Sequence, residues 1–142
     1  MSVMNNYDRC LNLELRKANR VLSQIYDSYM AKCGLKTSQF SILRAVSLLK
    51  KTTNRQLQDI LVLDQTTLSR GLKPLIRDGY IDVREGSDRR QKELLLSQTG
   101  KALFSEAERL WEEAQHYVEL NLGEETKKQL LTLSKAVVSL KL

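Results

Sequence analysis

The stretch LDQTTLSRGLKPLIRDGYI, residues 63–81, decides the fold. Four apolar residues recur within it at the i, i+4, i+7 and i+8 spacing of one helix face: Leu68, Leu72, Leu75 and Ile76. The opposite face carries polar and cationic residues, namely Thr66, Ser69, Arg70, Lys73 and Arg77. Gly79 ends the pattern, as glycine commonly does just past a helix. The stretch therefore predicts an amphipathic helix with a cationic outer face.

A shorter helix is predicted immediately before this one. Thr53 suits the N-cap of a helix over about 54–61, and a break of three residues then leads into the cationic helix. The side of the shorter helix that we expect to be apolar consists of Leu57, Ile60 and Leu61. Two short helices joined by a tight turn, the second one cationic on its outer face, are typical of a helix-turn-helix.

The residues on either side of this pair extend the unit. Thr37 suits the N-cap of a helix over about 38–50, whose apolar residues nearly encircle it and predict a central, buried element. After Gly79 the period changes to the alternation of a strand over 80–84, then turn residues at 86–88 and a return strand over 93–97. A β-hairpin that follows a recognition helix is called a wing.

Long apolar helices are predicted at both ends of the chain. The patterns cover about 5–33, 98–122 and 124–141. Their apolar stripes exceed what one small winged unit could cover, so we expect the same helices of a second copy to cover them in a two-fold dimer. The residues expected to form the dimer interface are Leu11, Leu15, Leu122, Leu130, Leu133, Val137 and Leu140.

The net charge of +6 is concentrated in the middle of the chain. Residues 36–101 carry 13 Lys and Arg against seven Asp and Glu, whereas the two ends nearly balance. A basic centre favours a polyanion such as nucleic acid as the partner. An ordinary lysine-rich surface would give the same sum, so the charge alone does not decide between them.

Several classes of protein are excluded by what the sequence lacks. No run approaches 18 apolar residues, and residues 1–10 show no basic segment followed by an apolar run, so we expect a cytoplasmic protein without a membrane partner. His116 is the only histidine, and there is no glycine-rich phosphate loop. We therefore expect no metal, no cofactor and no enzymatic activity.

Three stretches resemble the MarR (multiple antibiotic resistance regulator) family of transcription regulators. They are GLKTSQFSIL (34–43), LDQTTLSRGLKPLIRDGYI (63–81) and DRRQKELLLSQTGK (88–101). The last is similar to the wing signature of that family, and the resemblance covers essentially the whole chain. It implies a mainly α, α+β fold with a small β-hairpin: a winged helix-turn-helix over 36–101 within one domain, 1–142, flanked by dimerisation helices in 1–35 and 102–142.

The resemblance also implies a function. Members are homodimeric DNA-binding repressors or activators, often released from DNA by a small aromatic ligand or by thiol oxidation. We expect a sequence-specific repressor that binds an inverted-repeat operator in double-stranded DNA. The side chains expected to contact DNA are Gln65, Thr66, Thr67, Ser69, Arg70, Lys73, Arg77, Arg89, Arg90 and Lys92.

Each of these interpretations has an alternative. The polar stripe could only cap and solvate its helix, the hairpin tip could be a mobile solvated turn, and the winged fold could serve as a protein-interaction module without DNA binding. Tyr26, Tyr29 and Trp111 are candidates for an aromatic effector pocket, although aromatic residues on amphipathic helices more often belong to the core. Cys10 and Cys33 are either two small buried residues, a bridge between chains, or the thiols of a redox-sensing member of the family.

Overall fold

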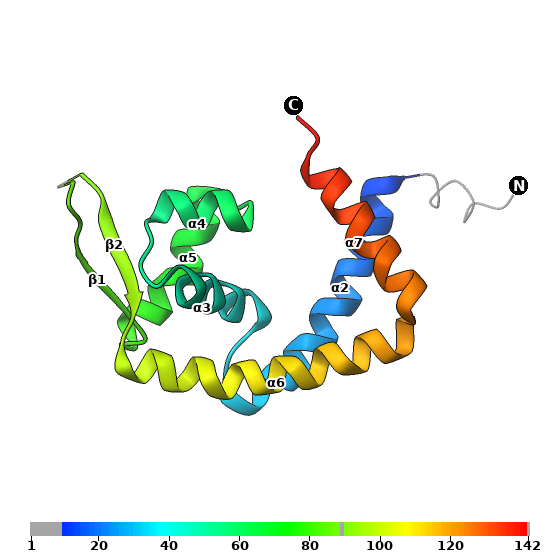
Figure 1. The fold of residues 1–142 in the computed structure, drawn as a ribbon, viewed down its shortest axis with the longest axis horizontal. Helices are drawn as coiled ribbons and strands as arrows, with labels where there is room; N and C mark the ends of the chain where they lie inside the picture. Colours follow the sequence, from blue (N-terminus) through cyan, green and yellow to red (C-terminus); the bar gives the residue numbers. More distant parts are fainter. Residues whose placement is uncertain (1–9, 89, 142) are drawn as a thin grey trace, which may run out of the picture.

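The computed structural model describes residues 10–88 and 90–141, which form helices and one β-hairpin (Figure 1). The elements in chain order are α2 (Leu11–Met30), the 3-10 turn η1 (Ala31–Cys33), α3 (Thr37–Leu49), α4 (Asn54–Leu61), α5 (Gln65–Arg77), β1 (Ile81–Glu85), β2 (Lys92–Leu96), α6 (Gln98–Leu122) and α7 (Glu124–Val138). This order confirms the predicted mainly helical fold with a hairpin. Residues 5–9 of the first predicted helix lie outside the described residues. None of the described helices has the length and apolar character needed to span a membrane.

Helix α3 lies at the centre of the winged unit, as predicted. It packs against α4, α5, α6 and β2. Its buried side chains include Phe40, Leu43 and Val46, which join Leu57 of α4 and Leu110 of α6 in one core. The predicted burial fails only at the last turn, where Leu48 and Leu49 are exposed.

The start of α4 is capped as predicted, whereas the start of α3 is not. The Thr53 hydroxyl accepts the Gln56 backbone N–H at 3.2 Å, and the Gln56 side chain accepts the Thr53 N–H at 3.1 Å, which is a capping box. Thr37 was expected to cap α3, but it is the first helical residue. The N-cap is Lys36, whose N–H is donated at 3.0 Å to the Gln39 side chain. The Thr37 N–H is donated at 2.7 Å to Asp27 on α2, so another helix helps to hold the start of α3.

The hairpin is attached to the helix-turn-helix through one buried threonine. β1 and β2 pair antiparallel with Ile81 opposite Leu96, and Thr52 adds a short bridge to Leu94 on the outer side of β2. The Thr52 N–H donates to the Leu94 carbonyl at 3.0 Å, and the Leu94 N–H donates to the Thr52 carbonyl at 2.7 Å. Because Thr52 directly precedes the cap of α4, the position of the wing depends on where α4 begins.

A second set of contacts joins the end of the recognition helix to the start of α6. We call Gly79, Tyr80, Ser97, Thr99 and Gly100 the α5–α6 joint. The Ser97 and Thr99 hydroxyls both donate to the Gly79 carbonyl, the latter at 3.0 Å, and the Ser97 N–H donates to the Tyr80 carbonyl at 3.0 Å. The Gly100 N–H donates to the Ser97 hydroxyl at 3.0 Å, so the same serine caps α6 and holds the preceding turn.

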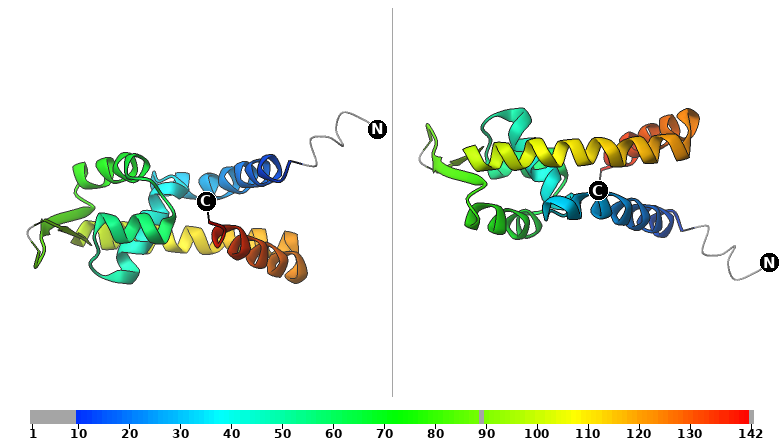
Figure 2. Two further views of the ribbon diagram at one scale, coloured as in Figure 1. Left: turned by 90° about the horizontal axis from the view of Figure 1, so that it is seen from above. Right: turned by 90° about the horizontal axis from the view of Figure 1, so that it is seen from below.

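Helix α6 carries the chain from this joint to the terminal helices without a break. It crosses residues 101 and 102, where the sequence interpretation placed the boundary between the winged unit and the dimerisation helices. α2 and α7 both pack against it. Seen from above and below, these two helices extend away from the winged unit, on the side opposite the hairpin (Figure 2).

We expect the Gly100→Ala substitution to destabilise the fold by about 2–3 kcal/mol, the upper range for overpacking. A Cβ atom at Gly100 would overlap the Tyr80 carbonyl oxygen, which is backbone and cannot rotate away. Thermal unfolding followed by circular dichroism measures the effect. Lys101→Ala, at the exposed neighbouring position, is the matched control. A Gly100→Ala protein that melts with the wild type would show that the joint tolerates a side chain.

Candidate nucleic-acid interface

Helix α5 presents its polar face to solvent because its apolar face is buried in the core. Leu68, Leu72 and Leu75 are almost completely buried. The predicted fourth member of the apolar stripe, Ile76, is 38% exposed, because it faces the space between α5 and the hairpin rather than α3. Five of the predicted DNA-contacting residues line one open depression of about 340 Å³ on the outer face: Gln65, Thr66, Ser69, Arg70 and Lys73.

Two other predicted contacts on α5 lie apart from this depression. Thr67 lines a neighbouring hollow with Gly71 and Pro74. Arg77 is bound to Asp78, with its Nε 3.1 Å from the carboxylate. The guanidinium holds the pKa of Asp78 below its usual value, mainly through this hydrogen bond. The positive charge of Arg77 is therefore partly balanced within the protein.

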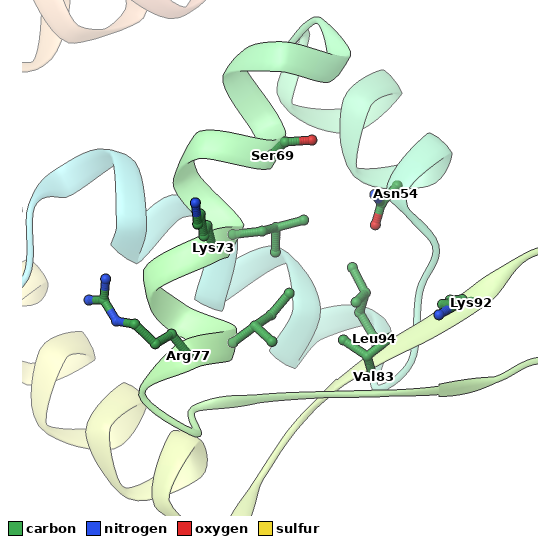
Figure 3. A pocket seen from close by; sticks show the side chains of 9 residues that line it. Asn54, Ser69, Lys73, Arg77, Val83, Lys92 and Leu94 are labelled. Carbon is green, nitrogen blue, oxygen red and sulfur yellow. The ribbon is translucent and has the colours of Figure 1, made fainter.

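A groove of about 520 Å³ separates the recognition helix from the wing (Figure 3). Its apolar walls are Leu72 and Ile76 from the helix, with Val83 and Leu94 from the hairpin. In the close view Lys73 and Arg77 project from α5 away from the strand residues. The groove thus divides the cationic surface into two parts, one on the helix and one on the hairpin.

The hairpin tip is closed by Asp88. Its carboxylate accepts the Arg90 N–H at 3.0 Å, and its backbone carbonyl accepts the Gln91 N–H at 3.0 Å. These bonds use the backbone of Arg90 and leave its exposed side chain available. Lys92, at the start of β2, is also exposed. Arg89, the other cation predicted at the tip, lies outside the described residues.

Helix α4 contributes polar residues that the sequence interpretation did not include. Asn54, Arg55 and Gln58 share a hollow of about 340 Å³ with Gln65, Arg90 and Lys92. Their sequence signal was weak: a polar pair directly after the Thr53 cap, at the start of the first helix of the motif. Only the fold shows that this turn and the hairpin face each other.

Asp64 caps the recognition helix. Its carboxylate accepts the Thr67 N–H at 2.7 Å. This backbone hydrogen bond is the main reason why the pKa of Asp64 is lowered, and the nearby Arg70 adds to it. The negative charge at the N-terminus also suits the helix dipole.

Replacement of Asp64 by Asn should remove a pH-dependent part of the stability while retaining the cap. Folding lowers the pKa of Asp64, so the ionised carboxylate stabilises the fold at every pH above the usual pKa of 3.8. This contribution is lost as the pH falls through the lower pKa of the folded protein. Urea unfolding of wild type and Asp64→Asn between pH 6 and 3 should therefore show a wild-type advantage that shrinks on acidification. A difference that is constant across this range would contradict the assignment. Asp64→Ala, which removes the cap as well, should be less stable than Asp64→Asn at every pH.

The three aromatic residues proposed for an effector pocket are divided between two places. Trp111 stacks on Phe40, with 6.1 Å between the ring centroids. The Arg44 guanidinium lies over the Trp111 ring, 4.5 Å from its centroid. Tyr29 packs against Tyr117 of α6 at 6.5 Å. Tyr26 donates a hydrogen bond to Gln115 of α6; burial, and then Glu119, raises its pKa. The cavities described above are lined by other residues.

Both cysteines are free thiols at opposite ends of one helical stretch. Cys10 is exposed at the N-cap of α2, and Cys33 is half-buried at the end of η1, its Sγ 3.3 Å from the Met30 carbonyl oxygen. A helical stretch of this length separates the two sulfur atoms by roughly 35 Å. A disulfide within one chain is therefore excluded.

Comparisons with known proteins agree with this architecture. The sequence profile described as MarR family matches residues 34–91. The transcriptional regulator MosR of M. tuberculosis, solved in complex with DNA, is 32% identical, with a TM-score of 0.81 over 94% of this chain and 100% of that one. The chain belongs to the MarR family. This is a family of DNA-binding transcriptional regulators and not of enzymes.

Two further transcriptional regulators extend the comparison. A cysteine-to-serine mutant of MarR from E. coli, solved with operator DNA, has a TM-score of 0.84 at 20% identity, over 96% of this chain and 99% of that chain, and so shows the shared fold. An uncharacterized HTH-type transcriptional regulator of Bacillus subtilis, YwoH, is 26% identical over 72% of this chain and 75% of its own. The winged helix-turn-helix with helices at both ends is thus the MarR fold, as predicted.

Proposed function

We propose that this MarR-family chain is a homodimeric repressor that binds an inverted-repeat operator and leaves it when a small aromatic ligand or another signal binds. The observation that carries the proposal is the exposed cationic surface of α5 and the hairpin, built on a buried apolar face. MosR and E. coli MarR, which share this fold, were each solved with DNA. An inserted recognition helix reads bases, and a wing reaches the minor groove or the backbone.

The dimer part of the proposal is supported by apolar residues that one copy leaves exposed. Leu11 is 78% exposed, Leu140 77%, Leu133 45% and Val137 38%. The other predicted interface residues are also accessible: Leu122 is exposed, and Leu15 and Leu130 are partly so. These residues belong to α2, to the last turn of α6, to α7 and to the segment just after α7. A second copy is the partner that covers equivalent helices by two-fold symmetry.

A charge placed in this surface should weaken dimerisation and, with it, DNA affinity. In Leu133→Glu a carboxylate would have to lose its hydration at the interface, which is strongly unfavourable without a partner. Light scattering at micromolar concentration should show a dimer for wild type and Leu133→Met, and a shift toward the 16.3 kDa monomer for Leu133→Glu. A wild-type protein that is monomeric under these conditions would refute the dimer.

The two cationic elements should make different contributions to DNA binding. Arg90→Ala removes a wing contact to the backbone or minor groove, so it should weaken binding to all DNA. For two subunits it should lower the slope of log K against log salt by at most about 1.8. Thr66→Ala or Arg70→Ala should instead cost roughly 1–3 kcal/mol per site on the operator and little on scrambled DNA.

The measurement is affinity for operator and scrambled duplexes at several salt concentrations. The operator itself can be found by sequencing the fragments that the purified protein retains from genomic DNA, where an inverted repeat with half-sites about 10–10.5 base pairs apart is expected. Equal affinity of wild type and Arg90→Ala for both duplexes would remove the wing from the interface. A wild-type protein that retains no specific fragment would favour the alternative, a winged protein-interaction module.

The proposed release signal is either a small aromatic ligand or oxidation of a cysteine thiol. For the aromatic branch, the candidate position is where α2 meets α6: a ligand there would displace the contacts of Tyr26 with Gln115 and of Tyr29 with Tyr117. The exposed Cys10 favours the redox branch. Peroxide treatment of the protein–DNA complex separates the two. Release from DNA that is lost in Cys10→Ser supports the thiol branch, and release that is retained in both Cys10→Ser and Cys33→Ser excludes the thiols.

A further inference from the structure

The hollow between α4 and the hairpin has the chemistry of a phosphate site. Three cations converge on it, Arg55 from α4 with Arg90 and Lys92 from the hairpin. The rest of its lining is polar: Thr53, Asn54, Gln58, Gln65 and Gln91. Among the described residues, no carboxylate lines it. We infer that Arg55, Arg90 and Lys92 hold one phosphate of the DNA backbone; this rests on the DNA-binding function proposed above. We call this set the phosphate clamp.

The cations of the phosphate clamp are not neutralised within the protein. Among the described residues, ion pairs hold Lys17, Lys51, Arg77, Arg109 and Lys127, and none of them includes a member of the clamp. Three like charges in one hollow repel one another, and an anion placed there would relieve the repulsion. A guanidinium fork matches the geometry of a phosphate, so Arg55 is suited to this role.

The two sides of the clamp are held at a fixed separation before any DNA arrives. Arg55 lies two residues after Thr53, whose capping box fixes the first turn of α4. Lys92 lies two residues before Leu94, and the Thr52–Leu94 bridge connects these two segments. Asp88 closes the turn that carries Arg90. The site is therefore preorganised, which reduces the ordering cost of binding.

The position of the clamp identifies the kind of DNA group it would hold. It lies between the start of α5, represented by Gln65, and the hairpin tip. If α5 enters the major groove and the hairpin approaches the next minor groove, the sugar-phosphate backbone passes between them. A contact there positions the protein on the duplex without reading sequence. Arg55 is thus a positioning residue of the interface.

The test uses operator duplexes that each carry one neutral methylphosphonate linkage at successive backbone positions. When the linkage at one particular position of each half-site is neutral, wild-type protein should bind the duplex roughly tenfold more weakly than the unmodified operator. This is the effect of losing one charge-assisted contact. Arg55→Gln should bind the unmodified operator and scrambled DNA more weakly by a similar factor, and it should no longer respond to that linkage. Arg90→Gln should become insensitive to the same linkage.

Arg109→Gln is the matched control, because this exposed arginine lies on α6 in a surface pair with Glu113. It should retain the wild-type response at every linkage, and all variants should melt with the wild type because the altered side chains are exposed. If Arg55→Gln keeps the full wild-type response, or if Arg55 and Arg90 respond to different linkages, the clamp is wrong while the DNA-binding function stands. If wild-type protein binds no duplex, the proposed function itself fails.

Discussion

The structure depends on the contact between a serine hydroxyl and the turn that ends the recognition helix. Ser97 accepts the Gly100 N–H and donates to the Gly79 carbonyl, so one side chain satisfies both the first turn of α6 and the last turn before β1. Gly100 allows the Tyr80 backbone to lie directly against α6. The recognition helix, the hairpin and α6 all meet within these few residues. Their relative orientation is therefore set by hydrogen bonds between a side-chain hydroxyl and the backbone, and not by apolar packing alone.

Features that depend on local chemistry could be predicted from the sequence. The apolar pattern and Gly123 predict the helix over 98–122 at its observed ends, whereas Ser97, predicted as the last residue of the return strand, is the N-cap of this helix. Thr53 is predicted as a cap from its residue type and its position before the helix, and the structure adds its partner Gln56, three residues away. The amphipathic α5 was also predicted, even though Pro74 lies inside it.

Features that depend on contacts between distant segments could not be predicted. Thr37 looks like a cap, but it is the first helical residue, and its N–H is bound by Asp27, ten residues earlier on another helix. Ile76 fits the apolar stripe of α5 but is turned toward the hairpin groove. Arg55 belongs to no sequence motif, and its proposed role as a phosphate contact follows only from the approach of the wing to α4. Gly71, unfavourable in a helix interior, has a reason in the fold, because a Cβ there would lie 2.6 Å from Ile42 of α3.

The unbroken length of α6 has a mechanical consequence. Its 25 residues span roughly 37 Å, and a stiff rod of that length converts a small tilt at one end into a large displacement at the other. A tilt of about 5° at the α7 end would move the α5–α6 joint by roughly 3 Å, close to the rise of one base pair. In the proposed dimer two such levers would move in opposite directions, so a slight change in the angle between subunits would shift the separation of the two recognition helices relative to the DNA helical repeat.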